Sequence, residues 1–150
     1  MPLFTQKSSA KLLSSQQVAD IKQAILNAEL DTSGEIRVHI ESSCPGDVLD
    51  RAALIFEKLD MHKTKLRNGV LFYLAIKNRK FAVIGDTEIN AKVPEGFWEK
   101  LKLEMLDYFR ENKFAEGLVW GIGETGKYLK KYFPYQSGDV NELPDDISFG

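Results

Sequence analysis

One stretch decides the fold: residues 68–84, which have the sequence NGVLFYLAIKNRKFAVI. The almost uninterrupted apolar run at 70–76 is typical of a central strand that is covered on both faces. A turn at 77–80 follows, and the apolar run at 81–84 predicts a second strand. Because so short a connection joins them as a hairpin, the two strands are expected to pair antiparallel.

Upstream of the hairpin, the pattern predicts a helix, a strand and a second helix. Ser14 and Gln17 have capping-box spacing, and apolar residues follow at helical intervals. Residues 35–41 alternate between apolar and polar side chains, which is typical of a strand with one polar face or edge. Asp47 has the type and position of an N-cap, and the second helix is expected to end near Asp60.

Downstream of the hairpin, helical spacing predicts two long helices at 94–112 and 114–133, with Pro94 suited to the first turn. A strand–helix–strand unit favours parallel pairing of residues 35–41 with residues 70–76. The predicted fold is therefore α/β: a three-layer α/β/α sandwich with a small mixed sheet.

The chain is expected to form one domain over residues 14–133. Residues 1–13 are predicted to be a flexible N-terminus. Residues 134–150 are predicted to be an acidic tail, either loose or lying on the surface.

Composition narrows the classes of function. The chain has 150 residues, 20 basic and 22 acidic, without a basic stripe, so nucleic acid is not an expected partner. It has no apolar window long enough to insert into a membrane and no signal-like apolar core near the N-terminus, so a cytoplasmic location is expected. One cysteine and two histidines are too few for a Cys/His zinc site.

Four short motifs, in this order, resemble the TPM domain family. They are Ser33 to Val38, Asn68 to Leu71, Phe81 to Asp86 and Phe114 to Leu118. The similarity spans residues 14–133, and the segments 132–135 and 141–144 resemble a short cytoplasmic bacterial branch of the family.

This resemblance implies an α/β/α sandwich. Relatives include a thylakoid protein with acid phosphatase activity linked to photosystem II repair, membrane-associated modulators, and bacterial domains that bind calcium or magnesium. The chain departs from the family pattern at two places. Arg67 replaces the usual acid before Asn-Gly, and residues 85–88 replace a glycine-rich loop.

The residues themselves suggest where a cation would bind. Asp86 ends one strand of the hairpin where Asn68 begins the other, so the two side chains should lie close together. Carboxylate and amide oxygens are ligands for Ca²⁺ or Mg²⁺. Glu88, two residues after Asp86, belongs to the same metal set, and Glu35, at the start of its strand, is a weaker addition to it. The structural alternative is that Asp86 caps the following turn and Asn68 forms a tight turn.

Other candidate groups surround this predicted cation site. Thr64, Lys65 and Arg67 are candidate anion-binding residues, although a solvated connector explains them as well. His39 and His62 are candidate general bases, although such histidines are more often surface residues.

A thiol phosphatase needs Cys-x5-Arg between a strand and a helix, whereas Cys44 and Arg51 are separated by six residues. One residue of slip redirects the arginine by about 100° on a helix. The pattern therefore favours a partly buried loop cysteine.

Residues 121–126, GIGETG, match the glycine pattern of dinucleotide-binding loops. That pattern requires a preceding strand, whereas the surrounding sequence predicts a helix. We therefore expect no nucleotide site here and interpret the glycines as a packing surface. The aromatic residues at helical spacing are likewise expected to pack in the core.

Two functions are compatible with the sequence. The first is a TPM-domain protein that binds a divalent cation through loop oxygens, with weak acid phosphatase activity. The alternative is a non-catalytic interaction module serving a membrane-bound partner.

Overall fold

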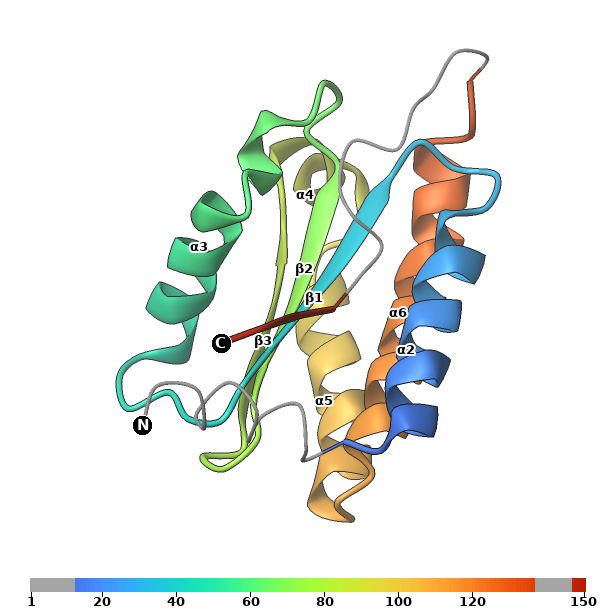
Figure 1. Cartoon of the computed structure of the whole chain (residues 1–150). Helices are drawn as coiled ribbons and strands as arrows, with labels where there is room; N and C mark the ends of the chain where they lie inside the picture. The colour runs from blue at the N-terminus through green and yellow to red at the C-terminus, as the bar shows by residue number, and fades with distance from the viewer. Residues whose placement is uncertain (1–12, 137–146) are drawn as a thin grey trace.

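The computed structural model describes residues 13–136 and 147–150, and within them one sheet separates two layers of helices (Figure 1). The strands are β1 (Glu35–Glu41), β2 (Gly69–Ala75), β3 (Lys80–Gly85) and β4 (Ile147–Phe149), in the order β3-β2-β1-β4. β1 is parallel to β2 and to β4, and β3 is antiparallel to β2. The predicted α/β sandwich with a mixed sheet is confirmed.

The helices divide unequally between the two faces of the sheet. The helix α3 (Val48–Lys58) covers one face, and α2 (Ser15–Glu29), α5 (Phe97–Arg110) and α6 (Phe114–Tyr132) cover the other (Figure 1). Two short helices, η1 (Met61–Lys63) and α4 (Thr87–Lys92), flank the strands. No helix in the described ranges is both long and apolar enough to span a bilayer.

Strand β2 packs on both faces, as its apolar run predicts. Val70, Phe72 and Leu74 belong to the larger core with α2, α5 and α6, because alternate side chains point to opposite faces. Leu71 and Tyr73 belong to the smaller core with α3. All seven residues of the strand are buried, which explains why its sequence lacks alternation.

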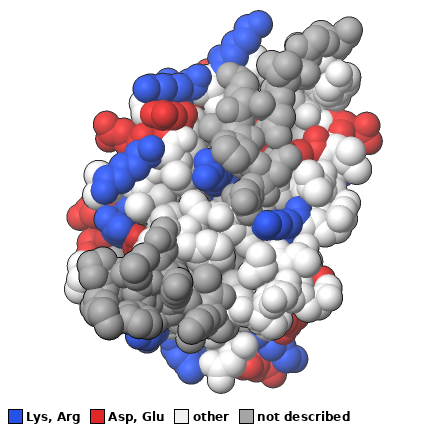
Figure 2. All heavy atoms as spheres, viewed as in Figure 1, with Lys and Arg blue, Asp and Glu red and all other residues white. Residues whose placement is uncertain are grey.

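Charged side chains of both signs are scattered over the surface of these layers. Figure 2 shows acidic and basic residues intermixed over the face seen in Figure 1. This distribution follows the near balance of 20 basic and 22 acidic residues in the sequence.

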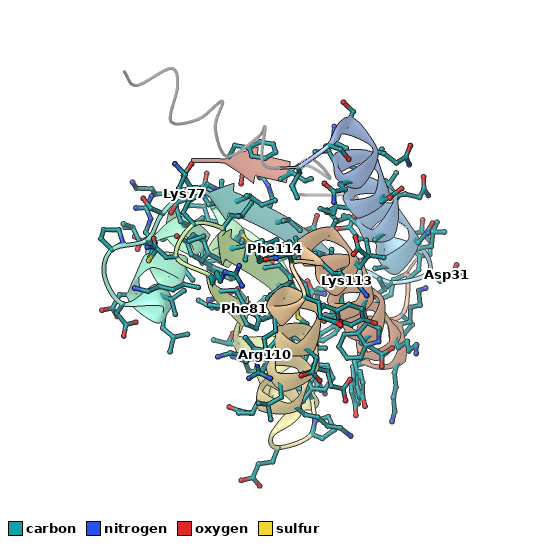
Figure 3. The ribbon with its side chains drawn as sticks, turned by 90° about the horizontal axis from the view of Figure 1, so that it is seen from below. Asp31, Lys77, Phe81, Arg110, Lys113 and Phe114 are labelled. Carbon is teal, nitrogen blue, oxygen red and sulfur yellow. The ribbon has the colours of Figure 1, made fainter. Side chains whose placement is uncertain are left out.

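Aromatic residues join β3 to the helix pair α5 and α6. Phe109 meets Phe81 edge-on, with ring centroids 4.8 Å apart, and lies 5.5 Å from Phe114. Figure 3 looks onto this end of the molecule and labels Phe81 and Phe114. The expected core role is confirmed for Phe109, which is buried, while Trp98 and Trp120 are partly buried against the same core.

The predicted caps of the first two helices are confirmed. The Ser14 hydroxyl accepts from the Gln17 backbone N–H at 3.1 Å, and the Gln17 side chain accepts from the Ser14 N–H at 2.8 Å. The Asp47 carboxylate accepts from the N–H groups of Leu49 and Asp50. Each cap satisfies backbone donors that a helix leaves unpaired.

The helix predicted at 94–112 was wrong at its start. A separate helix, α4, begins after Asp86, whose carboxylate accepts from the Thr87 N–H at 2.7 Å. Helix α5 begins only at Phe97, because Gly96 has a φ of +79° and breaks the helical path after Pro94. The sequence already indicated this cap, because Asp86 was expected, as one alternative, to cap the turn that follows it.

The prediction of a loose or surface-lying tail was wrong at its end. Residues 147–149 form β4, which pairs with β1 so that Val38 lies opposite Ile147. Ile147 is buried against the larger core. A three-residue strand is too short to show the alternation that identifies longer strands. The flexible N-terminus predicted at 1–13 falls outside the described residues except for residue 13, and so does 137–146 of the tail.

The GIGETG segment lies in the middle of α6, so the predicted helix is confirmed. A Cβ added at Gly117, Gly121 or Gly126 would lie 2.6, 2.6 and 2.8 Å from a neighbouring side chain. The packing role is therefore confirmed at these positions. It was wrong at Gly123, where an added Cβ would meet no atom within 4 Å.

Candidate functional site

The predicted cation-binding residues meet at one edge of the sheet. Glu35 pairs in register with Gly69, and the Asp86 N–H donates to the Gly69 carbonyl at 2.9 Å. The side chains of Glu35, Asn68 and Asp86 are all buried, at 3%, 1% and 5% exposure. The expected proximity of these residues follows from the parallel pairing of β1 with β2 and the hairpin of β2 with β3.

Arg67 supplies a cation to this edge from within the chain. Its Nε donates to Asp86 Oδ2 and its Nη2 donates to Asp86 Oδ1, both at 2.8 Å. Such a two-point pair is among the stronger hydrogen-bonded contacts in proteins. Arg67 has a φ of +50°, and its carbonyl accepts from the Glu88 N–H at 3.0 Å. The loop is thus held in a sparsely populated conformation.

Two buried polar groups beside this pair have no hydrogen-bond partner in the described part of the chain. They are the Thr64 hydroxyl and the Asn68 amide nitrogen, in residues that are 4% and 1% exposed. An unpaired buried polar atom is costly. A water could satisfy either group, whereas a cation could be bound by the Thr64 oxygen but not by an amide nitrogen. His62 Nδ1, in η1, is also buried without a partner.

The chemistry of this edge limits what it can hold. Residues 13–136 and 147–150 contain no group of three or more His, Cys, Asp and Glu side chains placed to hold a metal. Glu88 is exposed in the first turn of α4. The described residues of this edge therefore do not form a multi-carboxylate metal site. The anion-binding role of Thr64, Lys65 and Arg67 stays a prediction, and the Arg67 guanidinium already holds a carboxylate.

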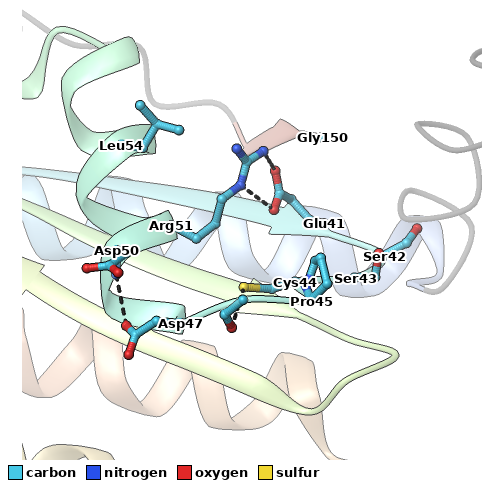
Figure 4. Close-up of a pocket in the computed structure, with 11 residues that line it drawn as sticks. Glu41, Ser42, Ser43, Cys44, Pro45, Asp47, Asp50, Arg51, Leu54 and Gly150 are labelled. Carbon is cyan, nitrogen blue, oxygen red and sulfur yellow. Dashed lines mark hydrogen bonds and ion pairs between the residues drawn. The ribbon is translucent and has the colours of Figure 1, made fainter.

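A second polar cluster, which the sequence analysis missed, lies at the opposite end of β1. Glu41 accepts hydrogen bonds from the Arg51 guanidinium (Figure 4). It also accepts one from the Tyr73 hydroxyl. His39 Nε2 lies 3.1 Å from Glu41 Oε1, and His39 Nδ1 lies 2.7 Å from the Ser148 hydroxyl. Of these residues, Glu41 and Arg51 line a cavity of about 600 Å³, together with Cys44 and Gly150.

Burial and hydrogen bonding shift the pKa values of Glu41 and His39 in this cluster. Burial alone would raise the pKa of Glu41, but hydrogen bonds from Arg51, Tyr73 and His39 lower it to about 2. Burial lowers the pKa of His39 below its ordinary 6.5, although Glu41 opposes this change. A neutral His39 that donates from Nε2 to Glu41 accepts at Nδ1 from Ser148. The hydrogen bond between His39 and Ser148 therefore links β1 to β4 through their side chains.

His39 had been expected on the surface, and this was wrong. It is 6% exposed because its ring stacks on Tyr73, with centroids 5.9 Å apart, and because Ser148 and Glu41 satisfy both nitrogens. The sequence contained one signal for this: His39 and Glu41 point the same way on one strand. A general-base role for His39 stays a prediction.

The Cys44–Arg51 pair does not form the thiol phosphatase arrangement. Cys44 is buried, at 2% exposure, and its backbone N–H donates to the Asn78 side chain at 2.6 Å. The Arg51 guanidinium is engaged by Glu41. The expectation of a loop cysteine is confirmed, with the thiol more deeply buried than expected.

Stability should fall in acid in two stages. Glu41 has a folded pKa of about 2 against 4.5 unperturbed, so its contribution is present above pH 4.5 and is lost as pH falls toward 2. His39 has a folded pKa below 6.5, so its contribution is present above pH 6.5 and declines below it. Urea unfolding midpoints should therefore decrease below pH 6.5 and more steeply below pH 4.5. In Glu41→Gln the second decrease should be weaker, and an unchanged profile would contradict this assignment.

Comparisons with known proteins agree with this fold. The TPM domain profile matches residues 7–128. The NMR structure of the BA42 protein from the psychrophilic bacterium Bizionia argentinensis is similar, with 43% identity, a TM-score of 0.84, and coverage of 92% of this chain and 95% of that one. The curated proteins give no match.

Two more distant structures share the fold. The N-terminal domain of a protein from P. gingivalis has 19% identity and a TM-score of 0.70, over 83% of each chain. The N-terminal domain of the cg2496 protein from Corynebacterium glutamicum has 15% identity and a TM-score of 0.64, over 87% of this chain and 81% of that one. From the profile match and the similarity to BA42, the chain belongs to the TPM domain family.

Proposed function

We propose that this TPM-domain protein binds a divalent cation, Ca²⁺ or Mg²⁺, at the sheet edge formed by Glu35, Asn68 and Asp86. The observation that carries the proposal is that the buried Asp86 carboxylate already holds a cationic group, the Arg67 guanidinium. Beside it, the Thr64 hydroxyl and the Asn68 amide nitrogen are buried without partners among the described residues. Rotating the Asn68 amide would turn its oxygen toward that space.

On this proposal, a divalent cation competes with Arg67 for Asp86. The Arg67 side chain is 44% exposed whereas the Asp86 side chain is 4% exposed, so the arginine can move into solvent while the carboxylate stays. Because the cation must displace the guanidinium, its net binding free energy is reduced. Affinity should therefore lie near 1 mM, at the weak end of protein calcium sites.

NMR titration with CaCl₂ and MgCl₂ tests the competition. Backbone amides at 62–69 and 85–90 should shift at millimolar metal in the wild type. Arg67→Gln should bind more tightly because it frees the carboxylate, and Asp86→Asn should abolish the shifts. Asp60→Asn is a matched control, because the Asp60 side chain lies just before η1 and is 63% exposed.

The same titration separates this function from the alternative of a non-catalytic interaction module serving a membrane-bound partner. If none of the amides at 62–69 and 85–90 moves at millimolar metal, cation binding at this edge is refuted. If Arg67→Gln binds no more tightly than the wild type, the competition is refuted while binding itself stands.

The proposal also includes weak acid phosphatase activity. A bound divalent cation supplies a Lewis acid that polarises phosphate oxygens. The assay is hydrolysis of p-nitrophenyl phosphate with and without EDTA, on the wild type and Asp86→Ala. Equal turnover in the two proteins would remove Asp86 from any such reaction.

A further inference from the structure

A groove on the helical layer lies far from both polar clusters in the fold. It has a volume of about 760 Å³ and runs between α2 and α6, beside Tyr108 of α5. Small and apolar residues line it, chiefly Ala24, Ala28, Val119, Gly123 and Trp120. Grooves of this size with mainly apolar walls are typical binding sites.

Gly123 is the residue in this groove that the fold does not explain. A glycine inside a helix costs about 1 kcal/mol relative to alanine. At Gly117, Gly121 and Gly126 of the same helix an added Cβ would lie within 2.8 Å of a neighbouring atom, so close packing offsets their cost. At Gly123 an added Cβ would meet nothing within 4 Å. The absence of a side chain there leaves the α6 backbone open to an occupant.

The charges along the groove are ordered. Helices α2 and α6 run in the same direction (Figure 1), and near their C-terminal ends an added Cβ at Gly126 would touch Ala28 while the Lys130 ammonium donates to the Asn27 carbonyl at 3.2 Å. Asp20 and Glu116 therefore line the end where both helices begin. Lys127 and Lys130 line the end where α6 finishes, and Lys127 also pairs with Glu124 at 2.5 Å along the same helix.

This order of charge complements a helix lying antiparallel to α2 and α6. Such a helix would bring its first turn, where acidic residues are favoured, to the two lysines. Its last turn, where basic residues are favoured, would reach the two acids. The dipole of the added helix would also oppose the dipoles of α2 and α6, which is the favourable arrangement.

We propose that the groove binds one amphipathic α-helix of a partner protein, antiparallel to α6, with its apolar face against Val119, Gly123 and Trp120. The lining residues 116–130 of α6 span about 20 Å, so the bound helix has about four turns. This helix-in-groove mode uses a row of apolar anchors at helical spacing. It is independent of cation binding at the sheet edge.

Two synthetic 16-residue amphipathic peptides with the same composition test the proposal. One carries Glu in its first turn and Lys in its last turn, and the other has these charges exchanged. The first should bind about tenfold more tightly, which corresponds to about 1.4 kcal/mol from the end charges. Binding should shift NMR amides of α2 and α6 and leave those at 62–69 unmoved.

Substitution at glycine provides the matched control. Gly123→Arg should abolish peptide binding while the protein stays folded, because nothing lies within 4 Å of the new Cβ. Gly46→Arg makes the same change at a loop glycine that also has open space, and binding should be retained. Equal affinity for the two peptides, full binding by Gly123→Arg, or no binding of either peptide at millimolar concentration would each overturn the proposal.

The competing occupants give different results. Sedimentation that shows a wild-type dimer and a Gly123→Arg monomer would assign the groove to a second copy of this chain and overturn the partner-helix proposal. A monomer in both proteins, together with charge-ordered peptide binding, supports it.

Discussion

Replacing Glu41 by alanine is expected to destabilise the fold by about 3 kcal/mol. The substitution removes the acceptor shared by the Arg51 guanidinium, the Tyr73 hydroxyl and His39. Tyr73 is 1% exposed, so its hydroxyl would be left buried without its partner. The free energy of unfolding, measured from urea denaturation at pH 7, checks this expectation.

Two variants calibrate the loss at Glu41. Glu57→Ala, at an exposed position of α3, should change the free energy of unfolding by less than about 0.5 kcal/mol. Glu41→Gln keeps the size of the side chain and should lose less than Glu41→Ala. If Glu41→Ala unfolds at the same urea concentration as Glu57→Ala, the network contributes nothing to stability.

Gly126→Leu is expected to cost about 3 kcal/mol, the upper part of the range for overpacked cores. The new Cβ would lie 2.8 Å from Ala28 Cβ and 3.0 Å from its Cα, so the side chain would push against the backbone of α2. Gly121→Leu should cost less, because the atoms it meets first, Met105 Sδ and Cε, belong to a flexible side chain. Thermal unfolding of the two variants compares them directly.

Gly123→Ala should instead stabilise the fold. It removes the propensity cost of a helical glycine without meeting a neighbour, so a gain of up to about 1 kcal/mol is expected. The expected order of melting temperature is Gly123→Ala, wild type, Gly121→Leu, Gly126→Leu. An inverted order for the last two would show that α2 yields more easily than the Met105 side chain.

Much of the fold could be predicted because its signals are local. The apolar run of β2, the short turn at 77–80 and the caps at Ser14 and Asp47 each depend on adjacent residues. These elements then fix the sheet register, which brings Glu35, Asn68 and Asp86 to one edge. That proximity follows from topology and needs no knowledge of side-chain conformation.

The remaining features depend on contacts between distant residues. Sequence placed Arg67 beside the predicted cation site but could not show that its guanidinium turns back onto Asp86, 19 positions later. The burial of His39 depends on Ser148, 109 positions away. Neither contact changes the spacing of apolar and polar residues along the chain, because each joins one pair of residues from separate elements.

The pairing of β4 with β1 has a consequence for the order of folding. Val38 and Ile147 meet only after a loop of more than 100 residues closes, and such closure is entropically costly and slow. Until then, one edge of β1 keeps its backbone donors and acceptors unpaired beside Ile36, Val38 and Ile40. An exposed apolar edge of this kind is a template for joining other chains. During synthesis on the ribosome, the risk of aggregation therefore lasts until residues 147–149 emerge and occupy that edge.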